Sequence, residues 1–498
     1  MPSGTTAAPT SAAPVTETPS GTPAPRPRPT EPDAIVVGSG VNGLAAAITL
    51  ARAGRCVWVY EAEDTLGGSV RSAELTLPGF IHDVCSAVYP LSVSSPFFKD
   101  LELDDYGLQF IQPEAALAHP FDNGTAAVIT HSLDETADQF GEDARAFLKL
   151  YTPLVQNWEQ ISEDILRPVH FPKRPFDLAR LGLNALFSAR HVAYSKFKND
   201  KARGVFAGMA AHSIMPLDSW GSASFGLILW TMCHCGGWPI AAGGAQSITN
   251  ALVAYLKSLG GEVFIGRRVT SLDELPKSRA VLLDLSPRQY LKLGGDRVAA
   301  SERRALEKFQ YGPGVFKVDW ALDAPIPWNA PSCALAATVH LGGTFEEIAE
   351  CEKAAWQGMV SPRPFIILCQ PTLFDPGRAP QDKHIAWGYC HVPSGSPFNM
   401  LERIEAQIER FASGFQKHIL ARHVWFPADL EKHNPNLVGG DLSAGAMTLS
   451  QTFLRPTRRL YSTSVSRVYL CSASTPPGPG VHGMCGRSAA ERALRECF

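Results

Sequence analysis

A glycine-rich segment near the start of the chain could bind the phosphates of a dinucleotide. Gly38, Gly40 and Gly43 follow the pattern G-x-G-x-x-G, and Val41 and Asn42 stand between the last two glycines. The first glycine would permit a tight turn, the second a close approach of the backbone to a diphosphate, and the third close packing of a helix on a strand. The helix that begins here would offer free N–H groups and its positive dipole end to the phosphates.

A second group of residues follows at the spacing that a dinucleotide site requires. Glu61 stands 18 residues after Gly43, where an acidic side chain accepts hydrogen bonds from an adenosine ribose, and we include its neighbour Ala62 in the site. Gly67 and Gly68 would bring the backbone close to the cofactor, and Arg71 would supply a cation to its phosphates. Alone, the arginine could lie on the surface and the glycine turn could belong to an unrelated α/β protein. Together the residues favour a bound dinucleotide.

The elements around these residues support this interpretation, because the glycines lie between an apolar run and a helical pattern. The sequence predicts strands over 34–37, 57–60, 262–265, 280–285, 364–368, 384–389 and 468–471, and helices over 44–53, 142–151, 245–259 and 400–418. The opening strand, helix and strand form the βαβ unit that the glycine motif needs.

Length and composition narrow the class of protein. The 498 residues are 45% apolar and 19% charged, which is typical of a globular protein with two or three folding units. A formal charge of −3 gives no indication of a nucleic-acid partner. Eleven irregularly spaced cysteines argue against a disulfide framework, and no apolar run is long enough for a membrane span or a signal peptide, so we expect a cytoplasmic protein. Residues 1–32 are rich in Pro, Thr and Ala and are expected to form a disordered tail.

The residues from Glu61 to Arg71, followed by Pro78-Gly79-Phe80-Ile81-His82-Asp83, resemble the FAD-binding start of the phytoene-dehydrogenase-like oxidoreductases. This family includes carotenoid desaturases, carotenoid isomerase and retinol saturase. The segments 311–322 and 435–441 resemble a bacterial branch of the same group. The strand at 468–471, the loop at 476–483 and the helix that starts near Gly486 resemble the closing element of the family, which places a helix N-terminus near the flavin ring.

The resemblance implies an α/β fold with a discontinuous, glutathione-reductase-like Rossmann-type domain for FAD. This domain would comprise residues 33–112, 236–310 and 455–498, and an inserted α+β substrate domain would comprise 113–235 and 311–454. The chain departs from the family in two places, at the terminal strand described below and after Val269. Only about ten residues separate Val269 from the strand at 280–285, where the family usually has a three-stranded meander.

The same resemblance adds further cofactor contacts. Val269, on the continuation of the strand 262–265, matches a position beside the adenine. Cys471-Ser472-Ala473-Ser474 replaces the usual Gly-Asp, so the two serines are candidates for the contacts of that acid. The loop near the flavin would supply Gly480, Val481, His482, Gly483 and Met484.

Few side chains suggest a catalytic role of their own. His482 is the one candidate, as a group that tunes the flavin or shuttles a proton, although it could instead be a loop histidine bonded to backbone. Cys485 lacks the surroundings of a flavin-tethering cysteine, so we expect non-covalent FAD. Cys233 and Cys235 flank His234, but a second ligand pair is missing and we expect no metal.

The leading hypothesis is an FAD-dependent desaturase, saturase or double-bond isomerase that acts on an apolar unsaturated lipid such as an isoprenoid or a fatty-acyl chain. Two alternatives stay open: an oxidase of amines or similar small molecules, and a flavin-free prenyl-binding protein like the Rab GDP-dissociation inhibitors. The basic and partly amphipathic stretch from Lys173 to Lys198 could rest on a membrane surface. Aromatic residues in and beside the middle of the chain could line a tunnel, or pack as ordinary core: Trp220, Phe225, Trp230, Trp238, Trp320 and Trp328.

Overall fold

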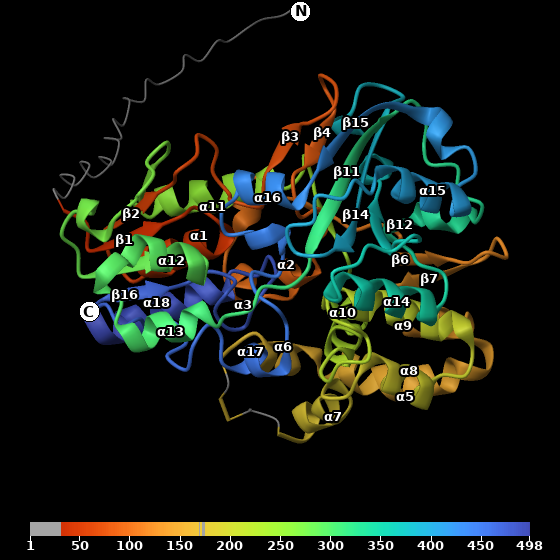
Figure 1. The fold of residues 1–498 in the computed structure, drawn as a ribbon, viewed down its shortest axis with the longest axis horizontal. Helices are drawn as coiled ribbons and strands as arrows, with labels where there is room; N and C mark the ends of the chain where they lie inside the picture. The colour runs from red at the N-terminus through yellow and green to blue at the C-terminus, as the bar shows by residue number, and fades with distance from the viewer. Residues whose placement is uncertain (1–30, 169, 172–174) are drawn as a thin grey trace, which may run out of the picture.

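The computed structural model describes residues 31–168, 170–171 and 175–498. The expected tail at 1–32 lies outside the described residues except for its last two positions, as do the first residues of the basic stretch at 173–198. Two β-sheets organise the chain, one in each of two lobes, and a layer of helices lies beneath the second sheet (Figure 1).

The first sheet is parallel and has the strand order β16-β10-β1-β2-β9. Its strands are short and apolar, and alternate residues of β1 face two separate cores: Ala34 and Val36 one, Ile35 and Val37 the other. A strand buried on both faces needs helices on both sides. The strands are β1 (Ala34–Val37), β2 (Val57–Tyr60), β9 (Glu262–Phe264), β10 (Ala280–Leu283) and β16 (Val468–Leu470).

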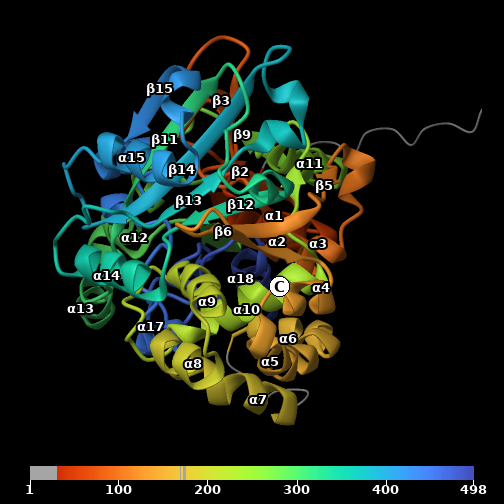
Figure 2. The ribbon, with the colours of Figure 1, turned by 90° about the vertical axis from the view of Figure 1, so that its right-hand side faces the viewer.

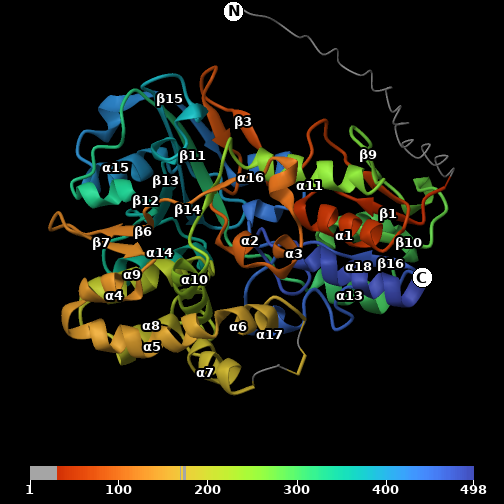
Figure 3. The ribbon, with the colours of Figure 1, turned by 180° about the vertical axis from the view of Figure 1, so that it is seen from behind.

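Helices cover both faces of this sheet, as a Rossmann-type fold requires. On one face α1 (Val41–Arg52) packs between α11 (Gln246–Ser258) and α18 (Met484–Cys497), so the first and the last helix of the structure lie side by side (Figure 3). On the other face lie α12 (Pro287–Gly294) and α13 (Ala300–Glu307). The predicted Rossmann-type α/β fold is therefore confirmed.

The connection between β9 and β10 is short, as the sequence indicated. It contains a single 3-10 turn, Leu272–Glu274, and no strand. The expectation that Val269 continues the strand was wrong, because β9 ends at Phe264 and Gly266 turns the chain with φ +61°. Val269 lies in the loop that follows.

The second sheet is mostly antiparallel, with the order β15-β11-β14-β13-β12-β6-β7 and one parallel pair, β12 with β6. Every one of its strands falls in the segments assigned above to the substrate domain, and every strand of the first sheet falls in the other segments. Helix α15 (Leu401–Phe411) packs on one face, and α14 (Phe345–Trp356) lies over the other, on the side of the helical layer. The strands are β6 (Ala115–Pro120), β7 (Ala126–Thr130), β11 (Gly314–Leu322), β12 (Ala336–Leu341), β13 (Ile366–Cys369), β14 (His384–Val392) and β15 (Ile419–Trp425).

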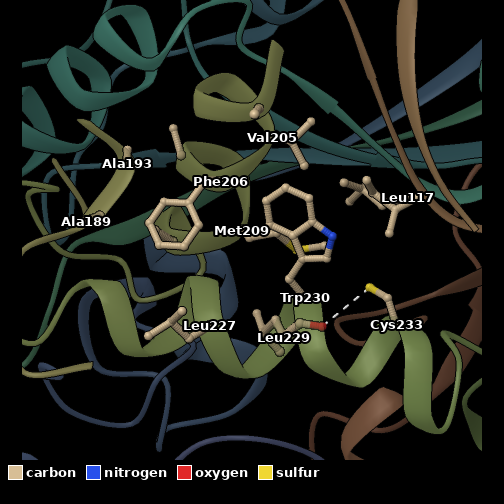
Figure 4. Packing of buried hydrophobic residues seen from close by; sticks show 14 of the residues in the cluster. Leu117, Ala189, Ala193, Val205, Phe206, Met209, Leu227, Leu229, Trp230 and Cys233 are labelled. Atoms are coloured by element: carbon tan, nitrogen blue, oxygen red, sulfur yellow. Dashed lines mark hydrogen bonds between the residues drawn. The ribbon is translucent and has the colours of Figure 1, made fainter. Parts of the chain in front are cut away.

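A layer of helices lies beneath this sheet (Figure 2), and it has its own aromatic core. Trp230 of α10 is fully buried there and lies against Phe206 and Met209 of α9 (Figure 4). The helices of the layer are α4 (Leu133–Asp138), α5 (Ala144–Gln156), α6 (Trp158–Ile165), α7 (Pro175–Ala185), α8 (Ala189–Lys196), α9 (Asp200–Ala211) and α10 (Ala223–Cys235).

Short elements connect the lobes and close the molecule. They are β3 (Ser72–Glu74), β4 (Ile81–Asp83), α2 (Pro90–Ser94), α3 (Pro96–Lys99), β5 (Phe110–Ile111), β8 (Ile240–Ala241), α16 (Pro427–His433) and α17 (Leu449–Phe453). Within the part of the chain that the structure describes, none of the helices combines the length and the apolar character that a membrane crossing demands.

Candidate functional site

A cavity of about 650 Å³ lies between the two lobes. One end is formed by the loops that follow β1, β2 and β10, at the carboxyl ends of the parallel strands. Ligands of open α/β sheets bind at this edge. The other end is formed by side chains of β13, β14 and the residues around α2 and α9.

The structure brings most of the site residues proposed from the sequence together around this one cavity. Gly43, His482, Gly483 and Met484 are the exceptions, and they lie outside its lining. The proposed residues that do line it are Gly38, Gly40, Val41, Asn42, Glu61, Ala62, Gly67, Gly68, Arg71, Val269, Ser472, Ser474, Gly480 and Val481.

Gly43 supports the site through packing. A Cβ atom at this position would lie 2.1 Å from the carbonyl oxygen of Gly38, far inside van der Waals contact. Only glycine therefore allows α1 to begin directly against the turn that follows β1. This is the packing role that the third glycine of the motif was expected to have.

Glu61 is held rigidly at the end of β2. One carboxylate oxygen accepts hydrogen bonds from the backbone N–H and the hydroxyl of Ser39, and the other accepts one from the N–H of Glu63 at 3.0 Å. The Ser39 hydroxyl oxygen in turn accepts a hydrogen bond from the Gly67 N–H at 3.0 Å. This network joins the two glycine-rich turns and fixes the carboxylate that was assigned to a ribose.

Arg71 is buried, with 7% of its surface exposed, yet it lines the cavity. Its Nε donates to the carbonyl of Gly68 at 2.8 Å, one Nη donates to the carbonyl of Thr65, and the other donates to Nε2 of His433 at 2.8 Å. Burial and the neighbouring guanidinium lower the pKa of His433 to about 4, so the histidine is a neutral acceptor. Since a guanidinium carries five N–H groups, two remain for an anionic ligand.

Asp284, at the end of β10, is a residue of the site that the sequence reasoning missed. Its Oδ2 accepts the N–H of Gly43 at 3.0 Å, so a carboxyl group occupies part of the N-terminus of α1. Burial raises the pKa of Asp284 to about 7, the Gly43 N–H opposes this shift, and the charge of Glu61 adds to it. No motif marks this residue, because its position depends on the pairing of β10 with β1.

The C-terminal loop contributes backbone to the cavity. The hydroxyl of Ser92 donates to the carbonyl of Val481, and that of Ser95 donates to the carbonyl of His482 at 2.6 Å. The hydroxyls of Ser472 and Ser474 donate to backbone carbonyls at 2.8 Å, which fixes the turn that replaces Gly-Asp.

His482 is 1% exposed and is bonded to its own loop. Its Nδ1 accepts the N–H of Met484 at 3.0 Å, and its Nε2 lies 3.2 Å from the carbonyl oxygen of Gly478. Burial lowers its pKa to about 4. Both ring nitrogens therefore serve the backbone, and the geometry matches the loop-histidine interpretation rather than a catalytic one. Cys485 is likewise buried, with its Sγ near the carbonyls of Thr475 and Gly478.

The far end of the cavity is mainly apolar and aromatic. Of the aromatic residues considered from the sequence, only Trp238 lines it; Trp230, Trp320 and Trp328 are core residues, and Trp220 is 65% exposed. The remaining wall residues were missed, although the alternation Trp387-Gly388-Tyr389 on β14 could have indicated two aromatic rings on one face. They are Val88, Leu91, His212, Leu229, Ile367, Trp387 and Tyr389.

Comparisons with known proteins agree with this geometry. Residues 36–101 match the family model described as NAD(P)-binding Rossmann-like domain. Pyridine nucleotide-disulfide oxidoreductase domain-containing protein 2 of Mus musculus is 25% identical, over 94% of each chain. Phytoene desaturase (lycopene-forming) of Pseudescherichia vulneris is 24% identical, over 92% of this chain and 98% of that protein.

Solved structures show the same fold. An oxidoreductase from Methanosarcina mazei aligns with a TM-score of 0.62 at 16% identity, over 93% of this chain and all of that one. Putrescine oxidase bound to putrescine aligns with a TM-score of 0.59 at 16% identity, over 93% and 98% of the two chains. With a Rossmann-type sheet, a cavity at its carboxyl edge and relatives along almost its whole length, the chain is similar to the phytoene-dehydrogenase-like oxidoreductases.

Proposed function

We propose that the protein is an FAD-dependent desaturase, saturase or double-bond isomerase that acts on an apolar unsaturated lipid. The observation that supports this most is that one continuous cavity joins the glycine turns, Glu61 and Arg71 at one end to an aromatic and aliphatic wall at the other. A cofactor and an apolar chain would meet inside it.

The residues at the nucleotide end fit FAD. The backbones at Gly40 and Gly68 adjoin, since a Cβ on Gly68 would lie 3.3 Å from the Cα of Gly40. Arg71 retains two N–H groups for the diphosphate, and Glu61 is oriented for a ribose. The second glycine turn and the C-terminal loop reach the same cavity, which a nicotinamide-only site would not need. When bound, the flavin would supply hydride-transfer chemistry, and the chain would supply binding, orientation and exclusion of water.

The wall at the other end favours an apolar substrate over an amine. Among the described residues that line the cavity, the acidic ones are Glu61, Glu63 and Asp284, and all three lie at the nucleotide end. No carboxylate is left to neutralise an ammonium group at the substrate end.

The relative orientation of two aromatic rings in this wall also argues against an aromatic cage for an amine. Trp387 and Tyr389 are nearly parallel, at 8°, with centroids 5.8 Å apart. A group held between two ring faces needs about 7 Å, twice a contact distance of roughly 3.5 Å. These rings therefore stack beside each other as part of a wall.

The test is anaerobic absorbance of the flavin band after the purified protein is mixed with a polyene, an unsaturated acyl lipid or an amine, with product analysis. Bleaching by a polyene or acyl lipid supports desaturation, and an isomerised product without bleaching supports isomerisation. Bleaching by amines alone would refute the lipid assignment. A colourless protein that binds prenylated partners would favour the flavin-free alternative.

We also propose that the face around α7 contacts a lipid surface, where such substrates dissolve. Leu183 is 70% exposed and Trp220 is 65% exposed. The ring of Phe187 lies 5.7 Å from that of Trp220, so exposed apolar groups gather at this edge. Exposed aromatic and aliphatic groups of this kind insert into the boundary between headgroups and acyl chains.

A further inference from the structure

Two histidines form a pair in the wall of the cavity. His212 follows the last residue of α9, and His340 lies on β12. Their Nε2 atoms are 2.9 Å apart, so one ring donates a hydrogen bond to the other. His212 lines the cavity, whereas His340 is fully buried behind it.

The surroundings of His340 decide which ring donates. Its Nδ1 is buried and has no hydrogen-bond partner in the described part of the chain. The ring packs against the backbone of α9, where a Cβ on Gly208 would lie 2.5 Å from this nitrogen. A buried N–H without a partner is rarer and more unfavourable than an acceptor without one. The proton of His340 therefore resides on Nε2 and points at His212.

This arrangement fixes the proton of His212 as well. Its Nε2 accepts the hydrogen bond from His340, so the proton of the neutral ring must be on Nδ1. That nitrogen has no protein partner among the described residues, and its ring borders the cavity. Burial, with a smaller contribution from nearby His391, lowers the pKa of His212 to about 3, which keeps the ring neutral.

The backbone two residues after His212 adopts a strained conformation. Ile214, two residues later, has φ +51°, a conformation that β-branched residues rarely adopt. Its N–H donates to the carbonyl of Ala211, and its carbonyl accepts the indole N–H of Trp356 at 2.7 Å. Strain of this kind is found where the position of a side chain matters.

We propose that Nδ1 of His212, oriented by His340, is a hydrogen-bond donor that anchors a carbonyl oxygen of an otherwise apolar substrate. The surrounding wall of Trp238, Leu229 and Ile367 is apolar, so a donor there would remain unpaired beside a pure hydrocarbon. The inference rests on the proposed function only in taking this cavity as the substrate site. It narrows the substrate class to an aldehyde, a ketone or an acyl derivative.

The test compares two probes of equal shape: β-ionone, a ketone, and the hydrocarbon in which a methylene group replaces its carbonyl oxygen. Their affinities for the full-length protein are measured by calorimetry. The wild type should bind the ketone about tenfold more tightly, which is the size expected for one well-placed hydrogen bond. In His212→Phe this preference should vanish, and in His212→Asn, which keeps an N–H near the position of Nδ1, it should partly return.

A matched control variant separates the loss of the His212 hydrogen bond from a change in the shape of the cavity. Leu91→Val alters the cavity lining on α2, an element that carries neither histidine of the pair, and should leave the tenfold preference unchanged. Equal affinities of the wild type for the two probes, or no binding of either, would overturn the anchor, as would a preference that survives in His212→Phe. The visible flavin spectrum is recorded for each variant. A wild type without flavin refutes the proposed cofactor, whereas a preference for the ketone would still support the anchor.

Discussion

Replacing Asp284 by asparagine should stabilise the protein at alkaline pH and have little effect at acidic pH. The carboxyl group lines the cavity at the N-terminus of α1, and its pKa is raised from 3.8 to about 7, mainly by burial. Asparagine has the same shape and keeps an oxygen that can accept the N–H of Gly43.

The direction of this pH effect on stability follows from the number of protons that the folded and the unfolded chain bind. Below about pH 4 the carboxyl is neutral in both the folded and the unfolded chain. Between about pH 4 and 7 the unfolded chain releases its proton while the folded chain keeps it, so the free energy of unfolding falls as pH rises. A difference of about three pKa units corresponds to about 4 kcal/mol, which is an upper bound because the side chain borders a cavity that water can enter.

The expected change in melting temperature is measurable. For 498 residues the entropy of unfolding is about 1 kcal/mol per kelvin, so a gain of 2–4 kcal/mol corresponds to roughly 2–4 °C. The melting temperature of Asp284→Asn, minus that of the wild type, should therefore rise by about this amount between pH 5 and pH 8. The variant should also retain more flavin at pH 8, because the negative charge of Asp284 no longer repels the diphosphate. The exposed Asp296→Asn serves as a control and should show no such rise. A difference between variant and wild type that does not change with pH would refute the assignment of a raised pKa.

Three further variants test other parts of the molecule. Gly43→Ala should abolish flavin binding, because the new Cβ would lie 2.1 Å from a backbone oxygen. The control Gly182→Ala, where a Cβ meets nothing within 4 Å, should leave the visible flavin absorbance unchanged. Retention of flavin by Gly43→Ala would contradict the packing role of Gly43. Trp230→Ala should lower the free energy of unfolding by about 3–5 kcal/mol in a denaturant titration, and a loss below about 1 kcal/mol would show that the core in Figure 4 is not tightly packed. The double variant Leu183→Ser and Trp220→Ser should sediment less with phospholipid vesicles while its flavin content stays the same; undiminished sedimentation would refute the membrane face.

The half of the cavity lining that the glycine turns form could be predicted because its signals are local. The run Ala34–Val37, the glycines after it and the helix from Val41 lie within 20 residues, and each type is required by backbone geometry. The contribution of the C-terminal loop could be predicted from the resemblance, and the structure places Gly480 and Val481 in the cavity. It leaves His482 outside the cavity lining, where two backbone groups of the same loop satisfy its ring.

The remainder of the site depends on contacts between residues that are distant in the chain. Asp284 reaches Gly43 because β10 pairs with β1, and His212 meets His340 because α9 packs near β12. The sequence shows that such a side chain can donate or accept a proton. Its hydrogen-bond partner and its degree of burial are set only when the two lobes fold.

The sequence by itself thus determined the Rossmann-type unit, the two glycine turns and the family resemblance, because backbone conformation and hydrophobic periodicity are properties of neighbouring residues. The tertiary structure alone decided the shape of the apolar wall, the raised pKa of Asp284 and the direction of the proton on His212. Each of these follows from desolvation and from partners that lie more than a hundred residues away.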